Sequence, residues 1–168
     1  MKKLFLLILF MCFLLFSKAP DEYTIKAVYL KKFASFVSWP KEAMEKEKFR
    51  IGVVGNDPFE GKLQDIYKTH KILEKSVEID YIKEIKSLDY HILFISKSEK
   101  RNIDSIIEKV KNSYILTISD TKDFSKHGVI INMINTPKGI DFVVNKNYEE
   151  QSKISLSIRF MKYARVIK

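Results

Sequence analysis

The first candidate for ligand chemistry is a glycine-containing turn, 52–58, that follows a predicted strand and precedes a predicted helix. A turn at this place in an α/β fold can bind phosphate, because the N–H groups at a helix start point toward an anion. The turn reads G-V-V-G-N-D-P, which lacks both G-x-G-x-x-G and the P-loop lysine, and it puts Asp57 where a phosphate would sit. We interpret it as a tight turn in which Asn56 or Asp57 caps the next helix, and we predict no cofactor.

Catalytic and metal-binding patterns are equally weak. The histidines, His70, His91 and His127, are far apart and form no H-x-x-x-H pair, so we interpret them as ordinary surface residues and predict no metal site. The sequence has no G-x-S-x-G motif. Glu149 and Glu150 are adjacent, and adjacent side chains on a helix point about 100° apart, so we assign them to a helix start instead of an acid/base pair. We predict no catalytic residues and no enzyme.

Aromatic residues gather near the first and last predicted helices, in excess of what one buried stripe needs. Core packing is one use for them. Exposed aromatic and arginine side chains also supply many of the strongest contacts in protein interfaces, so they can form a patch that grips a partner. The candidate partner-binding residues are Phe33, Phe36, Trp39, Arg159, Phe160 and Tyr163.

The first of these helices is predicted over 23–40. Asp21 is suited to cap it, Glu22 suits its first turn, and Pro40 ends it near Trp39. Lysines, among them Lys26, fall off the expected buried stripe. That stripe has i, i+3, i+4 spacing and consists of Ile25, Val28, Tyr29, Phe33, Phe36 and Val37.

The rest of the chain alternates strands and helices. Apolar runs predict strands over 49–54, 77–82, 91–96 and 114–119, and helical periodicity predicts helices over 58–70 and 102–111. A polar loop over 120–128 precedes a hairpin of strands 129–133 and 140–145, followed by a short helix over 147–151 and a longer one over 156–166. This order predicts a Rossmann-like three-layer α/β sandwich, with a mixed, mostly parallel sheet of about six strands and helices on both faces. We predict one domain over 20–168.

The N-terminus has the order of a secretory signal peptide. A basic start, Lys2 and Lys3, precedes an apolar run over 4–16 that is shorter than the roughly 20 residues of a membrane-spanning helix. We predict a signal peptide over 1–19, hence export to the periplasm, with cleavage after Ser17 as one alternative and an uncleaved membrane anchor as another. Cys12 follows Met11, not the small residue of a lipobox, so we reject a lipoprotein.

Charge and cysteine content narrow the function further. The formal charge is +9, and subtracting the three lysines of the leader leaves +6. Basic residues are interspersed with glutamates and no nucleic-acid-binding motif is present, so we predict no nucleic-acid partner. The one cysteine lies in the leader, so the mature chain has no disulfide and no thiol nucleophile.

Three segments in series resemble the YfiR-like family of periplasmic proteins. They are Y-T-I-K-A-V-Y-L-K-K-F-A-S-F-V-S-W-P from Tyr23, I-G-V-V-G-N-D-P-F from Ile51, and I-D-F-V-V-N from Ile140 followed by L-S-I-R-F-M-K-Y-A-R-V from Leu156. The resemblance implies an exported α/β domain without catalysis. It also implies that the domain binds the periplasmic part of an inner-membrane diguanylate cyclase, or of a related sensor, and represses it, thereby modulating cyclic di-GMP signalling. A homodimer is a further expectation, and the family's disulfide-based redox control cannot operate here.

Two other classes of function stay open. One is an exported small-molecule binding or sensing module, which would have an apolar pocket with a few polar groups. The other is an enzyme, which would have perturbed titratable groups clustered in a cleft. We expect membrane contact only through the partner or an uncleaved leader. The exposed parts of the first and last helices form the predicted partner-binding surface.

Overall fold

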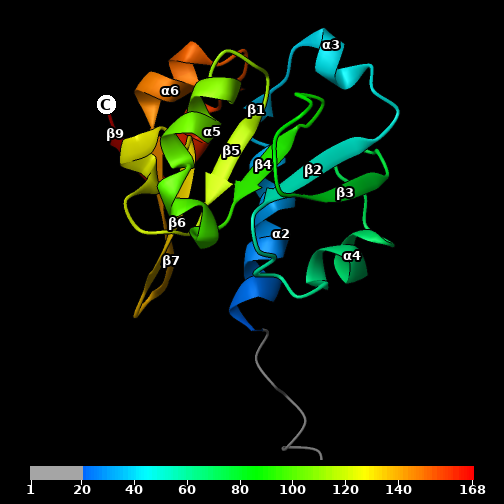
Figure 1. The fold of residues 1–168 in the computed structure, drawn as a ribbon, viewed down its shortest axis with the longest axis horizontal. Coiled ribbons are helices and arrows are strands. Elements are labelled where there is room, and N and C mark those ends of the chain that lie inside the picture. Colours follow the sequence, from blue (N-terminus) through cyan, green and yellow to red (C-terminus); the bar gives the residue numbers. More distant parts are fainter. Residues whose placement is uncertain (1–20) are drawn as a thin grey trace, which may run out of the picture.

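The computed structural model describes residues 21–168, and its centre is a seven-stranded β-sheet (Figure 1). The first five strands in spatial order are parallel, the sixth is antiparallel to the fifth, and the seventh is parallel to the sixth. In that order they are β3 (Val77–Ile82), β2 (Phe49–Val54), β4 (Ile92–Ile95), β5 (Leu116–Ser119), β6 (Ile131–Thr136), β7 (Gly139–Asn145) and β9 (Ala164–Ile167). The predicted mixed, mostly parallel α/β sheet is confirmed, with one strand more than expected.

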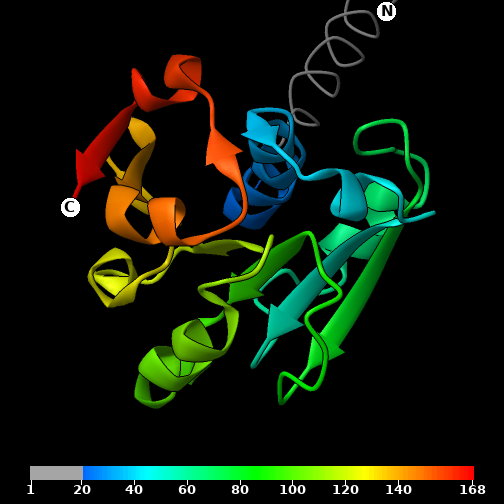
Figure 2. The same cartoon turned by 90° about the horizontal axis from the view of Figure 1, so that it is seen from above.

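Helices cover both faces of this sheet. On one face lie α2 (Glu22–Ala34), α4 (Lys62–Tyr67) and α7 (Ile158–Met161), and on the other lie α5 (Ile103–Val110) and the 3₁₀ helix η2 (Phe124–His127). Figure 2 shows α2 and α5 on opposite sides of the sheet. The remaining short elements are α3 (Lys41–Met44), η1 (Lys97–Arg101), α6 (Lys146–Gln151) and a two-stranded sheet of β1 (Val37–Ser38) and β8 (Ser155–Leu156).

The central strands are apolar along their whole length because each contributes to two cores. In β4, Ile92 and Phe94 face the core under α2, while Leu93 and Ile95 face the core under α5. Successive side chains of a strand point to opposite faces, so a strand covered on both sides has no polar alternation. The continuous apolar runs in the sequence therefore predicted the central strands correctly.

Helix α2 forms where predicted but ends at Ala34, before Trp39. Asp21 caps it by accepting hydrogen bonds from the N–H groups of Tyr23 and Thr24. The predicted buried stripe is confirmed in part: Phe33 and Val37 are buried, but Val28 is 53% exposed. The face that is buried consists of Lys26, Ala27, Leu30, Phe33 and Ala34.

Other predicted elements differ mainly at their ends. Helix α4 begins at Lys62 and ends at Tyr67, inside the predicted range 58–70. Helix α5 has the expected stripe of Ile103, Ile106, Ile107 and Val110, all buried. Strands β6 and β7 form the predicted antiparallel hairpin, and the polar loop before it contains η2.

The predicted helix over 156–166 is wrong. This segment consists of β8, the single turn α7 and strand β9. Strand β9 pairs with β7 in parallel, with Val166 beside Val144 and Ile167 beside Asn145. The segment has helical spacing of apolar residues, but β-branched side chains at its end suit a strand, and pairing with β7 outweighs local helix propensity. The short helix before it is confirmed as α6.

No helix within residues 21–168 is long and apolar enough to cross a bilayer. The predicted signal peptide, 1–19, lies outside the described residues.

Candidate partner-binding site

An aromatic groove of about 320 Å³ lies between α2, β7 and α7. Helix α2 and the turn after it contribute one wall, and Phe142 of β7 contributes the floor beside it. The segment of α7 and the residue after its C-cap supply the other wall. The groove is lined by Tyr29, Lys32, Phe33, Phe36, Phe142, Phe160 and Tyr163.

The small sheet of β1 and β8 brings the two walls together. Val37 pairs with Leu156 and Ser38 with Ser155, so the segment after α2 runs beside the segment before α7. The Ser157 N–H donates to the Phe36 carbonyl oxygen at 2.8 Å. The Ser157 side chain then caps α7 by accepting from the Phe160 N–H. Segments far apart in the sequence, 36–38 and 155–157, are fixed in this way across the groove.

The rings in the groove pack edge to face and stacked, which fixes their orientation. The ring of Phe33 packs edge to face against two others. Its centroid lies 5.2 Å from that of Phe142 and 5.4 Å from that of Phe160. Phe36 stacks on Phe160 at 5.5 Å, and Tyr29 meets Phe142 at 5.0 Å. Aromatic pairs at these separations are favourable beyond the area they bury. The groove is therefore a preformed, mainly apolar surface.

Four of the six predicted partner-binding residues line this groove. Phe33 and Phe160 are 1% and 2% exposed and form its base, Phe36 is half-buried, and Tyr163 is 76% exposed at its mouth. Arg159 is exposed on α7 outside the groove lining.

Trp39 lies outside the groove. Its ring packs against Phe49 and His91, and its Nε1–H donates to the Ala34 carbonyl oxygen at 3.1 Å. It therefore closes the C-terminal end of α2.

Sequence reasoning missed three lining residues, Tyr29, Lys32 and Phe142. Tyr29 was assigned to the buried stripe of α2, although it is half-buried beside the groove. Phe142 belongs to a family-like segment of β7, and its alternation with buried Val144 could have indicated that it faces α2. Lys32 carries no signal in the sequence that separates it from the other lysines.

The last segment of the chain is basic. From Gln151 to the end of the chain the sequence holds basic residues and no acidic one. Within the described residues, Lys32, Arg159, Lys162 and Arg165 take part in no ion pair. Of these four residues only Lys32 lines the groove, so the groove is mainly apolar with one lysine in its lining.

The other end of α2 is anchored by a buried lysine. Lys26 is 1% exposed, and its Nζ lies 2.6 Å from Asp120 Oδ2 and also contacts Glu22. The ammonium group lies 4.5 Å from the centroid of the Tyr23 ring. Burial, together with the nearby Asp120 carboxylate, raises the pKa of Tyr23. The expectation that Lys26 lies off the buried face is wrong because these partners compensate its charge.

This anchor occupies the place where open α/β sheets usually bind ligands. Asp120 follows β5 directly, and the crevice outside the carboxyl ends of the strands is the common ligand site of such folds. Here Tyr23 packs edge to face on Phe59, which follows β2. Asp57 accepts hydrogen bonds from the N–H groups of Phe59 and Gly61, as expected for a tight turn, although it does not cap α4 itself.

One interpretation of a titratable residue is wrong. His91 is not a surface residue: it is 1% exposed, its Nδ1 accepts from the Arg50 N–H at 3.0 Å, and its Nε2 lies 2.9 Å from the Ala43 carbonyl oxygen. Glu149 lies in the first turn of α6, as predicted, but it is 2% exposed and accepts from the Leu156 N–H at 2.8 Å. Lys146 compensates its charge. His91 and Glu149 each connect segments distant in sequence, which local patterns do not reveal.

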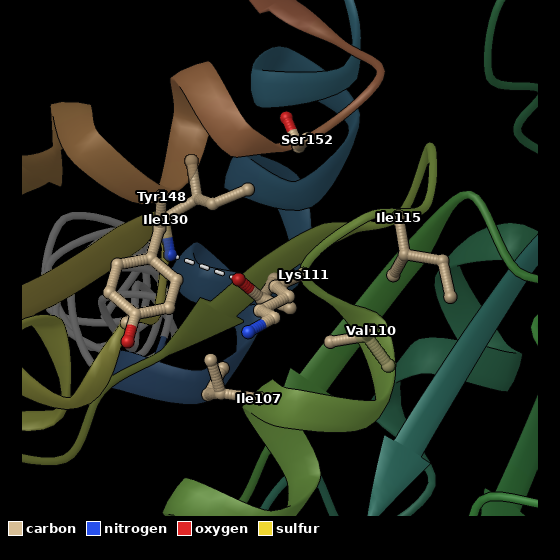
Figure 3. Close-up of a pocket in the computed structure, with 9 residues that line it drawn as sticks. Ile107, Val110, Lys111, Ile115, Ile130, Tyr148 and Ser152 are labelled. Atoms are coloured by element: carbon tan, nitrogen blue, oxygen red, sulfur yellow. Dashed lines mark hydrogen bonds between the residues drawn. The ribbon is translucent and has the colours of Figure 1, made fainter.

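A second cavity, between α5 and Tyr148 of α6, is too small for a ligand (Figure 3). Its volume is about 10 Å³, about the least that can hold one water molecule. The Ile130 N–H donates to Thr117 Oγ1 at 2.9 Å beside it, so the polar groups there have partners. This space is a packing gap.

The fold and the groove define a mixed α/β domain with a preformed apolar site at one end of its sheet. The sequence matches the model of the YfiR/HmsC-like family over residues 23–165. No curated protein matches it. Because the matched range covers most of the chain, the chain belongs to the YfiR/HmsC-like family, which confirms the resemblance read from its three segments. The family is generally regulatory rather than catalytic.

Proposed function

We propose that this protein is an exported, non-catalytic regulator that binds the periplasmic domain of an inner-membrane diguanylate cyclase, or of a related sensor, and represses it. The observation that carries the proposal is the aromatic groove with Tyr163 exposed at its mouth. Two of the family-like segments, those from Tyr23 and Leu156, supply both walls of the groove. Exposed aromatic side chains are suited to protein recognition.

Repression would work by population shift. A regulator that binds the inactive state of a membrane receptor more tightly than the active state moves the equilibrium by that difference in affinity. Shifting the receptor from almost fully active to almost fully inactive requires a preference of about 10⁴-fold. A preformed groove suits this role because little ordering entropy is lost when the partner binds.

The test begins with the partner. A gene beside this one that encodes a membrane protein with a GGDEF domain supplies the candidate cyclase. The mature chain is immobilised, detergent-solubilised membranes containing the cyclase are passed over it, and the retained cyclase and its cyclic di-GMP synthesis are measured. We expect retention and inhibition with the native chain, and loss of both with Phe36→Ala and Tyr163→Ala.

A matched control comes from an exposed tyrosine elsewhere. Tyr81 is 40% exposed on β3, at the opposite edge of the sheet, so Tyr81→Ala should retain and inhibit the cyclase as the native chain does. Undiminished retention by folded Phe36→Ala and Tyr163→Ala variants would refute the groove as the binding site. Failure of the native chain to retain or inhibit the cyclase would refute the proposed function.

A second candidate function is small-molecule binding in the same groove. Its volume of about 320 Å³ is at the lower end of ligand pockets, which span roughly 300–1,000 Å³, and Lys32 supplies a polar group in a mainly apolar lining. A ligand of this site would raise the melting temperature of the native chain and not that of Phe36→Ala. Screening apolar metabolites by thermal shift distinguishes this function from cyclase repression.

A further inference from the structure

Strand β9 leaves one edge of the main sheet open. It pairs with β7 alone, and no described strand lies on its other side. Figure 2 shows it at the outer end of the molecule, beyond the segment of α7. An edge strand presents a row of backbone N–H and C=O groups that can pair with another extended chain. The two most exposed large apolar side chains, Ile158 and Tyr163, lie just before it, at 79% and 76%.

The sheet end next to β9 is hollowed on both faces. The aromatic groove lies on the α2 face. A second hollow, of about 360 Å³, is lined in part by Phe142 and Tyr163 and otherwise by four residues that share one face: Ile134, Asp141, Val143 and Arg165. Asp141 pairs with Ile134, and Val143 pairs with Arg165, so these four side chains share the face opposite Phe142 and Val144. Tyr163 lines both hollows.

A strand added along β9 would reach both hollows. Its successive side chains would point alternately to the two faces of the extended sheet. On the α2 face they would meet the aromatic groove and Val166, which is 43% exposed. On the other face they would meet Arg165 on β9, with Asp141 one strand further in, on β7. The fitting segment therefore alternates apolar with acidic residues.

We propose that β9 accepts an extended acidic segment of the protein partner as an additional strand. This inference rests on the proposed function and specifies how the partner binds. We choose an acidic segment because of charge complementarity. The last part of the chain, from Gln151 on, is basic and has no acidic residue. An acidic segment would supply the counter-charges that Lys162 and Arg165 lack among residues 21–168.

A second copy of this chain fits the edge poorly. Pairing of two β9 strands would bring the same basic side chains close together, and like charges on neighbouring strands are destabilising. Basic residues on a short edge strand are also a common protection against self-association. A flat anionic membrane would attract the same charges, but it would not fill two hollows on opposite faces of a sheet. An acidic extended segment satisfies the edge, the hollows and the charge together.

The test uses the mature chain and a short synthetic peptide in which glutamate alternates with valine. Affinity is measured by calorimetry, and hydrogen–deuterium exchange is followed over 162–168. We expect saturable binding and slower amide exchange in β9, because strand addition engages its backbone N–H groups. Arg165→Glu and Lys162→Glu should each weaken binding roughly tenfold. Lys100→Glu, on the exposed η1, is the matched control and should bind as the native chain does.

Each alternative has its own outcome in this test. The inference is overturned by equal binding of a peptide with lysine in place of glutamate, or of one N-methylated at its central residues. It is also overturned if the glutamate–valine peptide does not bind, or binds without slowing exchange in β9. Binding to phosphatidylglycerol vesicles without peptide binding would assign the surface to a membrane. A concentration-dependent dimer that slows exchange in β9 would assign it to a second copy.

The result is separable from that for the proposed function. Suppose that the cyclase is retained and inhibited while amide exchange in β9 is unchanged in that complex. Strand addition is then refuted, and cyclase repression is supported. Suppose instead that the peptide adds to β9 while the cyclase is neither retained nor inhibited. The proposed partner is then refuted, and the site on β9 for an acidic strand is supported.

Discussion

The two ends of helix α2 are held by different chemistry. At the first end Lys26 is buried beside Asp120 and Glu22, so its charge is compensated inside the molecule. At the second end the rings of Phe33 and Phe36 line a groove that opens to solvent, and Lys32 in its lining takes part in no ion pair among the described residues. The comparison indicates that the first end fixes the helix and the second end is available to a partner.

The fixed end also uses hydrogen bonds to the middle of the helix. The Tyr67 hydroxyl donates to the Ala27 carbonyl oxygen at 2.7 Å and accepts from the Lys31 N–H at 3.1 Å. Tyr67 belongs to α4, so α4 and the loop after β5 both hold α2 in place. The orientation of the groove wall therefore depends on contacts far from the groove.

Removing the buried lysine should have the largest effect on stability. Lys26→Ala leaves Asp120 as a buried charge with its main partner lost, and breaking a buried ion pair in this way costs about 3–5 kcal/mol. Denaturant unfolding measures the loss. The double variant Lys26→Met with Asp120→Asn removes both charges and should recover most of it. A double variant as unstable as the single one would contradict a role for the charges.

Truncation at the base of the groove should cost somewhat less. Phe160 is 2% exposed and contacts Phe33 and Phe36, so Phe160→Ala should lower the free energy of unfolding by about 3 kcal/mol. This is the lower end of the usual range, because the cavity would open into the groove. Thermal or denaturant unfolding measures it. A loss below about 1 kcal/mol would show that the base is not packed as described.

Because Phe160 is part of the core, loss of partner binding by Phe160→Ala would not separate folding from recognition. Phe36 and Tyr163 are better probes, since the first is half-buried and the second mostly exposed.

Acid should weaken the C-terminal end of α2 through His91. Burial lowers the pKa of His91, whose Nδ1 accepts a hydrogen bond from the Arg50 N–H and cannot do so when protonated. The unfolded chain then binds more protons than the folded one below about pH 6.5, so stability is full above that pH and falls as the pH decreases. Asp89 opposes this shift, and Lys75 and Lys46 add to it.

The single tryptophan makes this effect measurable. The Trp39 ring lies 5.6 Å from that of His91, so its fluorescence should change together with the loss of stability between about pH 7 and pH 5. The variants His70→Gln and His127→Gln change exposed histidines and should keep the same pH dependence. An unchanged melting temperature across this range would contradict the role of His91.

The same contrast explains what the sequence could predict. Continuous apolar runs such as 92–95 must be buried on both faces, so the central sheet and the apolar stripe of α5 could be derived. The state of 156–166 depends on pairing with β7, a contact between segments that local spacing does not encode. The burial of Lys26, His91 and Glu149 was not predicted because each is buried only through partners distant in the sequence.

The groove was predicted in part for a similar reason. An excess of aromatic residues near two segments correctly indicated that Phe33, Phe36, Phe160 and Tyr163 come together. Trp39 has the same residue type and lies near the same helix, yet it turns to His91 and the end of α2. Residue type predicts that an aromatic side chain is partly buried. Only the fold determines which surface it packs against.

The smallest effect on stability should come from the most open part of the groove. Tyr163 is 76% exposed, so Tyr163→Ala should change the free energy of unfolding by no more than about 0.5 kcal/mol, because few of its contacts are lost. Denaturant unfolding beside Tyr81→Ala measures the change. A loss comparable to that of Phe160→Ala would mean that Tyr163 closes the core. The second end of α2 would then be as fixed as the first.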